Sequence, residues 1–223
     1  MSIQTIIDNA TFVTVNKRKV AASSVSRSGH IKTADRGVGV YQFTVGMHAG
    51  LTYSTNRSLL ESLDTMDVIN EANISLNNNT GMNYVTAYQG DLTQANLDQI
   101  VCTTGTGTDG ANIHIDTTGV TGSPSGILFK AGDYIQPLGN TSTYRYPYQV
   151  TSDVTFSPSS DLTIPVHRGV LTQTGTSITT GGLRVGNAVN FQVKALSMPT
   201  YSIVPHDRVQ FSGDFELMEV ITD

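Results

Sequence analysis

Hydrophobic and polar residues alternate along most of the chain, and this pattern predicts β-strands whose two faces meet different surroundings. In the clearest case, one face of a single strand carries Tyr41, Phe43, Val45 and Met47. The same alternation predicts roughly ten strands in all, among them residues 10–15, 82–88, 112–116, 127–136, 144–156, 162–166, 187–195 and 214–221. Short strands at this spacing are typical of sandwiches and barrels, so we expect a mainly β, antiparallel sandwich or barrel.

One segment has the period of a helix instead. Its apolar stripe consists of Leu59, Leu60, Leu63 and Met66. Ser58 is followed three positions later by Glu61, the spacing of a capping box, in which each side chain binds a backbone N–H left without a partner at the helix start. The sequence therefore predicts one short helix near residues 58–67.

Two clusters of turn-forming residues interrupt the strand pattern, NNNTG at residues 77–81 and the Thr/Gly-rich loop of residues 103–112. The chain shows no repeat of fixed period, no heptads and no long Pro-rich or charged linker. We therefore expect an N-terminal β-rich part with the helix at residues 1–122 and a C-terminal all-β part at residues 123–223. The alternative is one intertwined domain.

Charge and hydropathy exclude several functions. The 223 residues carry a formal net charge of −5, and Lys17, Arg18 and Lys19 form the only adjacent basic run, which argues against a nucleic-acid-binding face. No stretch approaches the 18 or so apolar residues that cross a bilayer, so we expect no membrane insertion. The N-terminal segment MSIQTIIDNA has no basic region followed by an apolar core, so we expect no secretory signal.

The residues with nucleophile or ligand chemistry are scattered. Cys102, the single cysteine, ends an apolar run and is interpreted as a packed residue rather than a nucleophile. No G-x-S-x-G elbow occurs. No two histidines are closer than 18 positions, and none has a local metal-ligand spacing: His30, His48, His114, His167 and His206.

The glycine loop around Gly105, Gly107 and Gly110 resembles a phosphate-binding loop only superficially, because a strand pattern follows it and the P-loop lysine is missing. The acidic loops TGTDG and SPSSD each supply a single carboxylate, which is too few for calcium. The sequence therefore predicts no catalytic, cofactor or metal site.

The segment TYRYPYQV places Tyr144, Tyr146 and Tyr148 on one face of a strand. Such a row can be a binding surface for sugar or protein, or one side of a core or subunit contact. We favour the core interpretation because Val150 continues the same face. Pro147 must lie at an edge or a bulge, where no ladder N–H is needed.

Taken in order, six segments resemble the distal-tail and minor-tail proteins of tailed bacteriophages: SRSGHIKTADRGVGVYQFTVGM, RSLLESLDTMD, ILFKAGDYIQPLG, YRYPYQVTSDV, LTIPVHRGVL and DFELMEV. The resemblance spans residues 26–220. Its most specific part joins residues 131–135, residues 148–150, Asp153 and residues 164–168. That family often has Trp in its first strand pattern, where this chain has Tyr41 and Phe43, and this chain has an extra loop at residues 103–110.

The resemblance implies a non-enzymatic virion protein, made in the host cytoplasm, that forms a ring or adaptor at the tail tip or baseplate. Its partners would be copies of itself in a hexamer or trimer, the tail tube, and hub or fibre proteins. DNA would only pass through the lumen, where an excess of carboxylates would repel its phosphates.

Particular residues have roles in this hypothesis. Gly132 and Asp133 are expected to form a tight turn. Arg145 and Arg168 are expected at subunit contacts, where a guanidinium can bridge carboxylates such as Asp153.

Two other classes of function remain open. A receptor- or carbohydrate-binding β-module would expose an aromatic platform beside polar loops. A glycan-cleaving tail enzyme would need two carboxylates facing each other at roughly 5 to 9.5 Å, and no spacing of Asp and Glu singles out such a pair.

Overall fold

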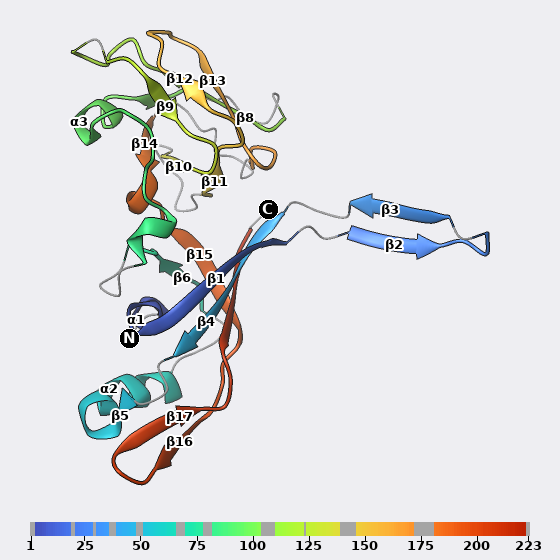
Figure 1. Cartoon of the computed structure of the whole chain (residues 1–223), viewed down its shortest axis with the longest axis vertical. Coiled ribbons are helices and arrows are strands. Elements are labelled where there is room, and N and C mark those ends of the chain that lie inside the picture. The colour runs from blue at the N-terminus through green and yellow to red at the C-terminus, as the bar shows by residue number, and fades with distance from the viewer. Residues whose placement is uncertain are drawn as a thin grey trace. The chain divides into compact units, whose positions relative to one another are not determined.

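The computed structural model describes eleven ranges of the chain: residues 3–18, 21–28, 30–35, 39–47, 51–65, 70–77, 82–103, 110–122, 124–138, 146–171 and 181–221. Across these ranges the fold is mainly β and its strands pair in antiparallel fashion, which confirms the predicted fold class (Figure 1). The sheets are open rather than closed into a barrel within the same ranges.

The chain divides into two compact units. Unit 1 comprises Met1–Ala72 and Val193–Val220, and unit 2 comprises Asn73–Gln192 and Ile221–Asp223. The predicted boundary between residues 122 and 123 falls inside unit 2. The division differs because β18 (Phe215–Glu219), near the C-terminus, pairs with β4 (Val40–Met47), near the N-terminus.

The largest described sheet with strands in unit 1 has five strands. Its order is β1 (Ala10–Arg18), β4, β18, β15 (Phe191–Ser197) and β6 (Ala72–Ile74). On β4 the side chains of Tyr41, Phe43 and Val45 are fully buried, as the alternation predicts, whereas Met47 is half-buried. Helix α1 (Ile3–Asp8) adds three buried isoleucines to this core.

The predicted helix is present as α2 (Tyr53–Asp64), and Leu59, Leu60 and Leu63 are buried as expected. The predicted capping box is wrong, because α2 begins before Ser58 and Glu61 forms an ion pair with Arg57 at 3.2 Å. Met66 lies outside the described residues. Beside α2 lies a three-stranded sheet in the order β16 (Tyr201–Val204), β17 (Arg208–Phe211) and β5 (Leu51–Thr52).

Unit 2 is built around a six-stranded sheet. Its order is β11 (Tyr148–Gln149), β10 (Tyr134–Pro137), β14 (Gly181–Val185), β7 (Val101–Cys102), β8 (Asn112–Asp116) and β13 (Leu162–Pro165). A second pair, β9 (Ile127–Phe129) and β12 (Val154–Thr155), packs on the same core, together with the short helix α3 (Gln94–Leu97).

The predicted strands of unit 2 are partly correct. Strand β8 has the predicted bounds, whereas residues 127–136 and 144–156 each contain two separate strands instead of one. The turn at Gly132 is confirmed, since this glycine has φ +105°, a conformation that side chains disfavour. The strand expected at residues 82–88 is wrong, because Asn83–Val85 forms a 3-10 helix, η1. A second 3-10 helix, η2 (Gly186–Ala188), precedes β15.

Two sequence expectations lie largely outside the described residues. They are the interiors of the NNNTG cluster and of the Thr/Gly-rich loop, of which residues 78–81 and 104–109 are not described. Within the described ranges, no helix has both the length and the apolar character that a membrane span requires.

Candidate functional site

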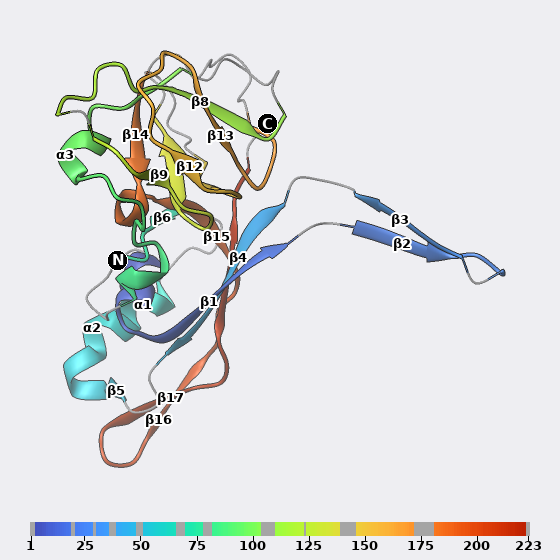
Figure 2. The same ribbon diagram turned by 45° about the horizontal axis from the view of Figure 1, so that its top comes forward.

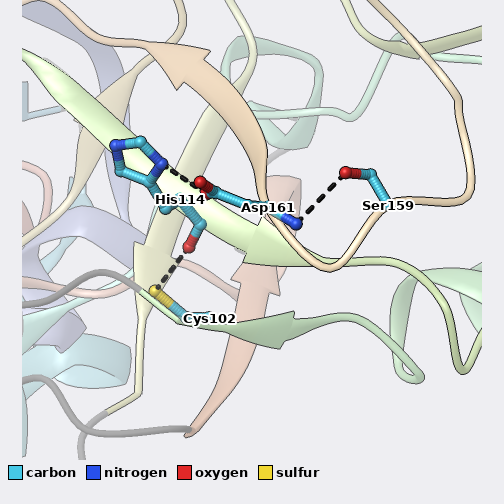
Figure 3. Close-up of polar contacts among 4 residues, drawn as sticks. All are labelled: Cys102, His114, Ser159 and Asp161. Carbon is cyan, nitrogen blue, oxygen red and sulfur yellow. Dashed lines mark hydrogen bonds and ion pairs between the residues drawn. The ribbon is translucent and has the colours of Figure 1, made fainter.

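Four residues of unit 2 with nucleophile or base chemistry lie near one another: Cys102, His114, Ser159 and Asp161 (Figure 3). His114 Nδ1 lies 2.6 Å from an Asp161 carboxylate oxygen. The Sγ of Cys102 contacts the backbone carbonyl of His114 at 3.6 Å, and the hydroxyl of Ser159 accepts the N–H of Asp161 at 3.1 Å. Neither contact joins a nucleophile to the imidazole.

The strand alternation explains this separation. Cys102 is paired with Ile115 in the β7–β8 ladder and belongs to the same buried cluster, whereas His114, next to Ile115 on β8, points to the opposite face. Cys102 is fully buried, which confirms its interpretation as a packed residue.

The remaining histidines do not gather either. His30 lies in an exposed turn, His167 Nδ1 accepts the backbone N–H of Gln149 at 3.0 Å, and His206 lies in the β16–β17 turn. His48 is outside the described residues. Within the described ranges, no three His, Cys, Asp or Glu side chains are grouped as metal ligands would be.

Asp133, in the turn that the sequence predicts, connects three segments of unit 2. Its carboxylate accepts the backbone N–H groups of Gln89 and Lys130, each at 2.9 Å, and its backbone carbonyl accepts that of Val150 at 2.9 Å. Burial raises the pKa of Asp133, and the two N–H donors oppose that rise. Asp133, which belongs to the most specific part of the resemblance, therefore has a structural role: it connects neighbouring segments of unit 2.

The tyrosine row lies in the core where it is described. Tyr146 and Tyr148 are both buried, whereas Tyr144 and Arg145 lie outside the described residues. Pro147 precedes β11, an edge strand, in agreement with the prediction.

Arg168 is only 5% exposed and lies inside unit 2, so the expectation that it makes a subunit contact is wrong. Its guanidinium carbon lies 5.3 Å from the centre of the Tyr148 ring and 5.9 Å from that of Tyr146, and one nitrogen donates to the carbonyl of Pro147 at 2.9 Å. The two rings offer the guanidinium a buried position that replaces its hydration. Asp153, the expected partner, accepts the backbone N–H of Ala131 at 2.8 Å.

The most exposed apolar feature of unit 1 is an isolated β-hairpin, β2 (Ala21–Val25) and β3 (Ile31–Asp35), which we name the arm. Among the described strands, these two pair only with each other, and Figures 1 and 2 show no third strand beside them. Val25 and Ile31 face each other at the turn end and are 69% and 70% exposed. A two-stranded hairpin is marginally stable by itself in water, so this one gains stability from any surface that covers it.

The segment that contains the arm also concentrates positive charge. Residues 17–36 hold six of the 13 Lys and Arg residues but only one of the 18 Asp and Glu residues. The rest of the chain then has seven basic and 17 acidic residues. The small net charge of the chain therefore conceals a contrast between a basic segment, residues 17–36, which contains the arm, and an acidic remainder.

A second feature of unit 1 is a surface groove of about 500 Å³ between α2, the strands β16 and β18, and the turn that follows β15. Its lining is mostly apolar: Leu63, Asp64, Met198, Pro199, Thr200, Tyr201, Ile203 and Phe215. The hydroxyl of Tyr201 donates to Asp64 at 2.8 Å and so ties the end of α2 to β16. This hydrogen bond, with burial and the negative charges of Asp64 and Glu61, raises the pKa of Tyr201 to about 12.

Asp207 fixes the other end of α2. It lies in the β16–β17 turn, where its backbone carbonyl accepts the N–H of Tyr53 at 3.0 Å and its carboxylate accepts the N–H of Ser54 at 2.9 Å. The Ser54 hydroxyl donates to the other carboxylate oxygen. The walls of the groove are thus held together at both ends of the helix.

Neither a protein-family model nor a curated protein sequence matches the chain. The sequence patterns did not predict the arm or the groove. The charge contrast between residues 17–36 and the rest was the available signal for the arm, whereas the groove depends on contacts between α2 and strands far along the chain.

Proposed function

We propose that the chain is a structural virion protein of a tailed bacteriophage. It forms a ring or adaptor at the distal end of the tail tube, at the tail tip or baseplate, and connects the tube to hub or fibre proteins. It is not an enzyme in this proposal, and it acts through contacts between copies of itself.

The observation that carries the proposal is the arm. In an isolated chain, this solitary hairpin leaves the apolar side chains of Val25 and Ile31 in water. An assembly that covers the hairpin would bury this apolar area and stabilise the hairpin. The edge strand β1 offers a further row of backbone groups to a neighbouring chain.

A receptor- or carbohydrate-binding module is the alternative, and it gains less support. Tyr146 and Tyr148 were its candidate platform, and both are buried. Tyr84, 71% exposed, is a large aromatic side chain at the surface of unit 2, and a single ring is a small platform for a sugar.

The acidic remainder of the chain agrees with DNA as cargo. Outside residues 17–36, an excess of carboxylates disfavours retention of phosphates on a channel wall. The partners in this proposal are other copies, as a hexamer or trimer, with the tail tube on one side and hub or fibre proteins on the other.

Electron microscopy tests the proposal in two steps. Negative-stain images of the purified chain should show closed rings with a central hole, and immunogold labelling of particles from the phage that encodes the chain should mark the distal end of the tail. Particles without label, or label on the capsid, would refute the assignment.

A further inference from the structure

We infer that the arm of one copy docks into the groove of a second copy, with Val25 and Ile31 covering its apolar wall. The inference rests on the proposed function for its setting in a ring, but it concerns one specific interface, so the two can fail separately.

Arm and groove are complementary in their apolar surfaces. Val25 and Ile31 form one exposed cross-strand pair, and Ile203, 57% exposed, stands at the groove. Leu63 and Phe215 extend the same apolar wall below the surface. Apolar area is therefore exposed both on the arm and at the groove, and one contact between copies would remove both from water.

The charges beside the two surfaces are also complementary. Arg27 and His30 are exposed in the turn beside the apolar pair of the arm. At the groove, Asp64 is part of the lining. Glu61 lies one turn earlier on α2, with an exposed side chain that pairs with the equally exposed Arg57 at 3.2 Å. Of the described residues that line the groove, none is basic. Opposite charges at the rim of an interface guide association and exclude other orientations.

Because arm and groove are different surfaces of the same chain, the contact is heterologous: each copy offers an arm to one neighbour and a groove to the other. Such contacts close into a ring when the rotation between copies fits a whole number of subunits. The inference thus supplies the contact that a ring requires.

Disulfide trapping between two differently marked chains tests the contact. One chain carries Val25→Cys and the other, extended by a larger tag, carries Ile203→Cys; the native Cys102 is buried and stays unreactive. Mild oxidation of the mixture should give a heterodimer band between the two chains. The control replaces Ile203→Cys with Tyr84→Cys, an exposed site in unit 2, and should give little product.

A charge exchange provides an independent readout. Arg27→Glu should weaken self-association about tenfold. Adding Glu61→Arg should restore most of it, because both charges are then reversed and the two side chains attract each other again. In the matched control, Asp98→Arg, an exposed charge reversal at the end of α3 in unit 2, replaces Glu61→Arg and should not restore the association that Arg27→Glu weakens.

Several results would overturn the inference. Trapping within one chain when both cysteines are present, without dimers, would show that the arm folds onto its own groove. Rings that form equally well with Arg27→Glu would leave the proposed function standing and remove this contact. Loss of binding to a labelled DNA duplex in Arg27→Glu, with association unchanged, would show that the arm recognises nucleic acid instead.

Discussion

Replacing Asp207 by alanine tests whether one side chain, distant in sequence, holds α2 against the β16–β17 hairpin. The native residue accepts the N–H of Ser54 at 2.9 Å and binds the Ser54 hydroxyl as well. It also has φ +59°, in the left-handed region that Asp tolerates better than Ala. Asp207→Ala therefore removes a helix cap and strains the turn at the same time.

The expected cost has three contributions. Loss of an N-terminal cap costs about 1 kcal/mol. Loss of a negative charge at the helix start costs about 0.5 kcal/mol, and alanine in the left-handed region costs about 1 kcal/mol. The total of about 2.5 kcal/mol corresponds to roughly 60-fold more frequent opening of the first turn of α2.

Hydrogen–deuterium exchange followed by mass spectrometry measures this opening locally. The peptide that covers α2 should exchange roughly 60-fold faster in Asp207→Ala, whereas the peptide that covers β8, in unit 2, should be unchanged. Asp207→Asn keeps an acceptor oxygen and a residue that tolerates the turn, so its α2 peptide should exchange only about threefold faster.

Ser58→Ala is the matched control, because Ser58 is the cap that the sequence pattern suggests and the structure places it inside the helix. Its α2 peptide should exchange within about twofold of the wild-type rate. If Ser58→Ala accelerated exchange as much as Asp207→Ala, or if Asp207→Ala had no effect, Asp207 would not be the residue that fixes the start of α2.

Three further predictions concern single side chains. Arg168→Lys should lower the free energy of unfolding by about 2 kcal/mol in urea titrations followed by circular dichroism, since an ammonium cannot stack on two rings. The exposed control Arg57→Lys should change the free energy of unfolding by less than about 0.5 kcal/mol. A change in self-association without a change in stability would contradict the buried role of Arg168. Tyr201 has its pKa raised from 10.0 to about 12 in the folded chain, so the folded state keeps a proton that the unfolded state loses, and stability should fall as pH rises through this window. Tyr201→Phe should show a shallower fall, and an unchanged slope would contradict the assignment. Asp133→Asn should cost about 1 to 3 kcal/mol, because Gln89 and Lys130 donate to different carboxylate oxygens, and Asn replaces one of these oxygens with an NH2 group that cannot accept. Since the pKa of Asp133 is raised from 3.8, the wild type should lose some stability as pH rises above this value, and the Asn variant should not.

Local patterns predicted what depends on local physics. The alternation at Tyr41, Phe43 and Val45 identified a strand and its buried face, because adjacent strand positions point to opposite faces. The leucine stripe identified α2, because residues three or four positions apart lie on the same side of a helix. The turn at Gly132 was predictable from glycine's tolerance of positive φ.

Local sequence patterns could not predict contacts between segments that are distant in the sequence. The cap of α2 comes from Asp207, 153 positions after Ser54, so the start of the helix was placed too late. Arg168 is buried because Tyr146 and Tyr148 supply ring faces for it, which a charged residue in a sequence does not reveal. Strands β2 and β3 were not predicted, because Ala in β2 and Lys, Ala and Asp in β3 are residues of low strand propensity.

The mass distribution of the purified full-length chain, measured by mass photometry across a dilution series, tests the central claim most directly. A subunit of 23.9 kDa that acts by assembling should give one dominant species at a fixed multiple of this mass, three or six, and Val25→Ser combined with Ile31→Ser should shift it toward single chains. A wild-type chain that remains at 23.9 kDa at every concentration would contradict the account.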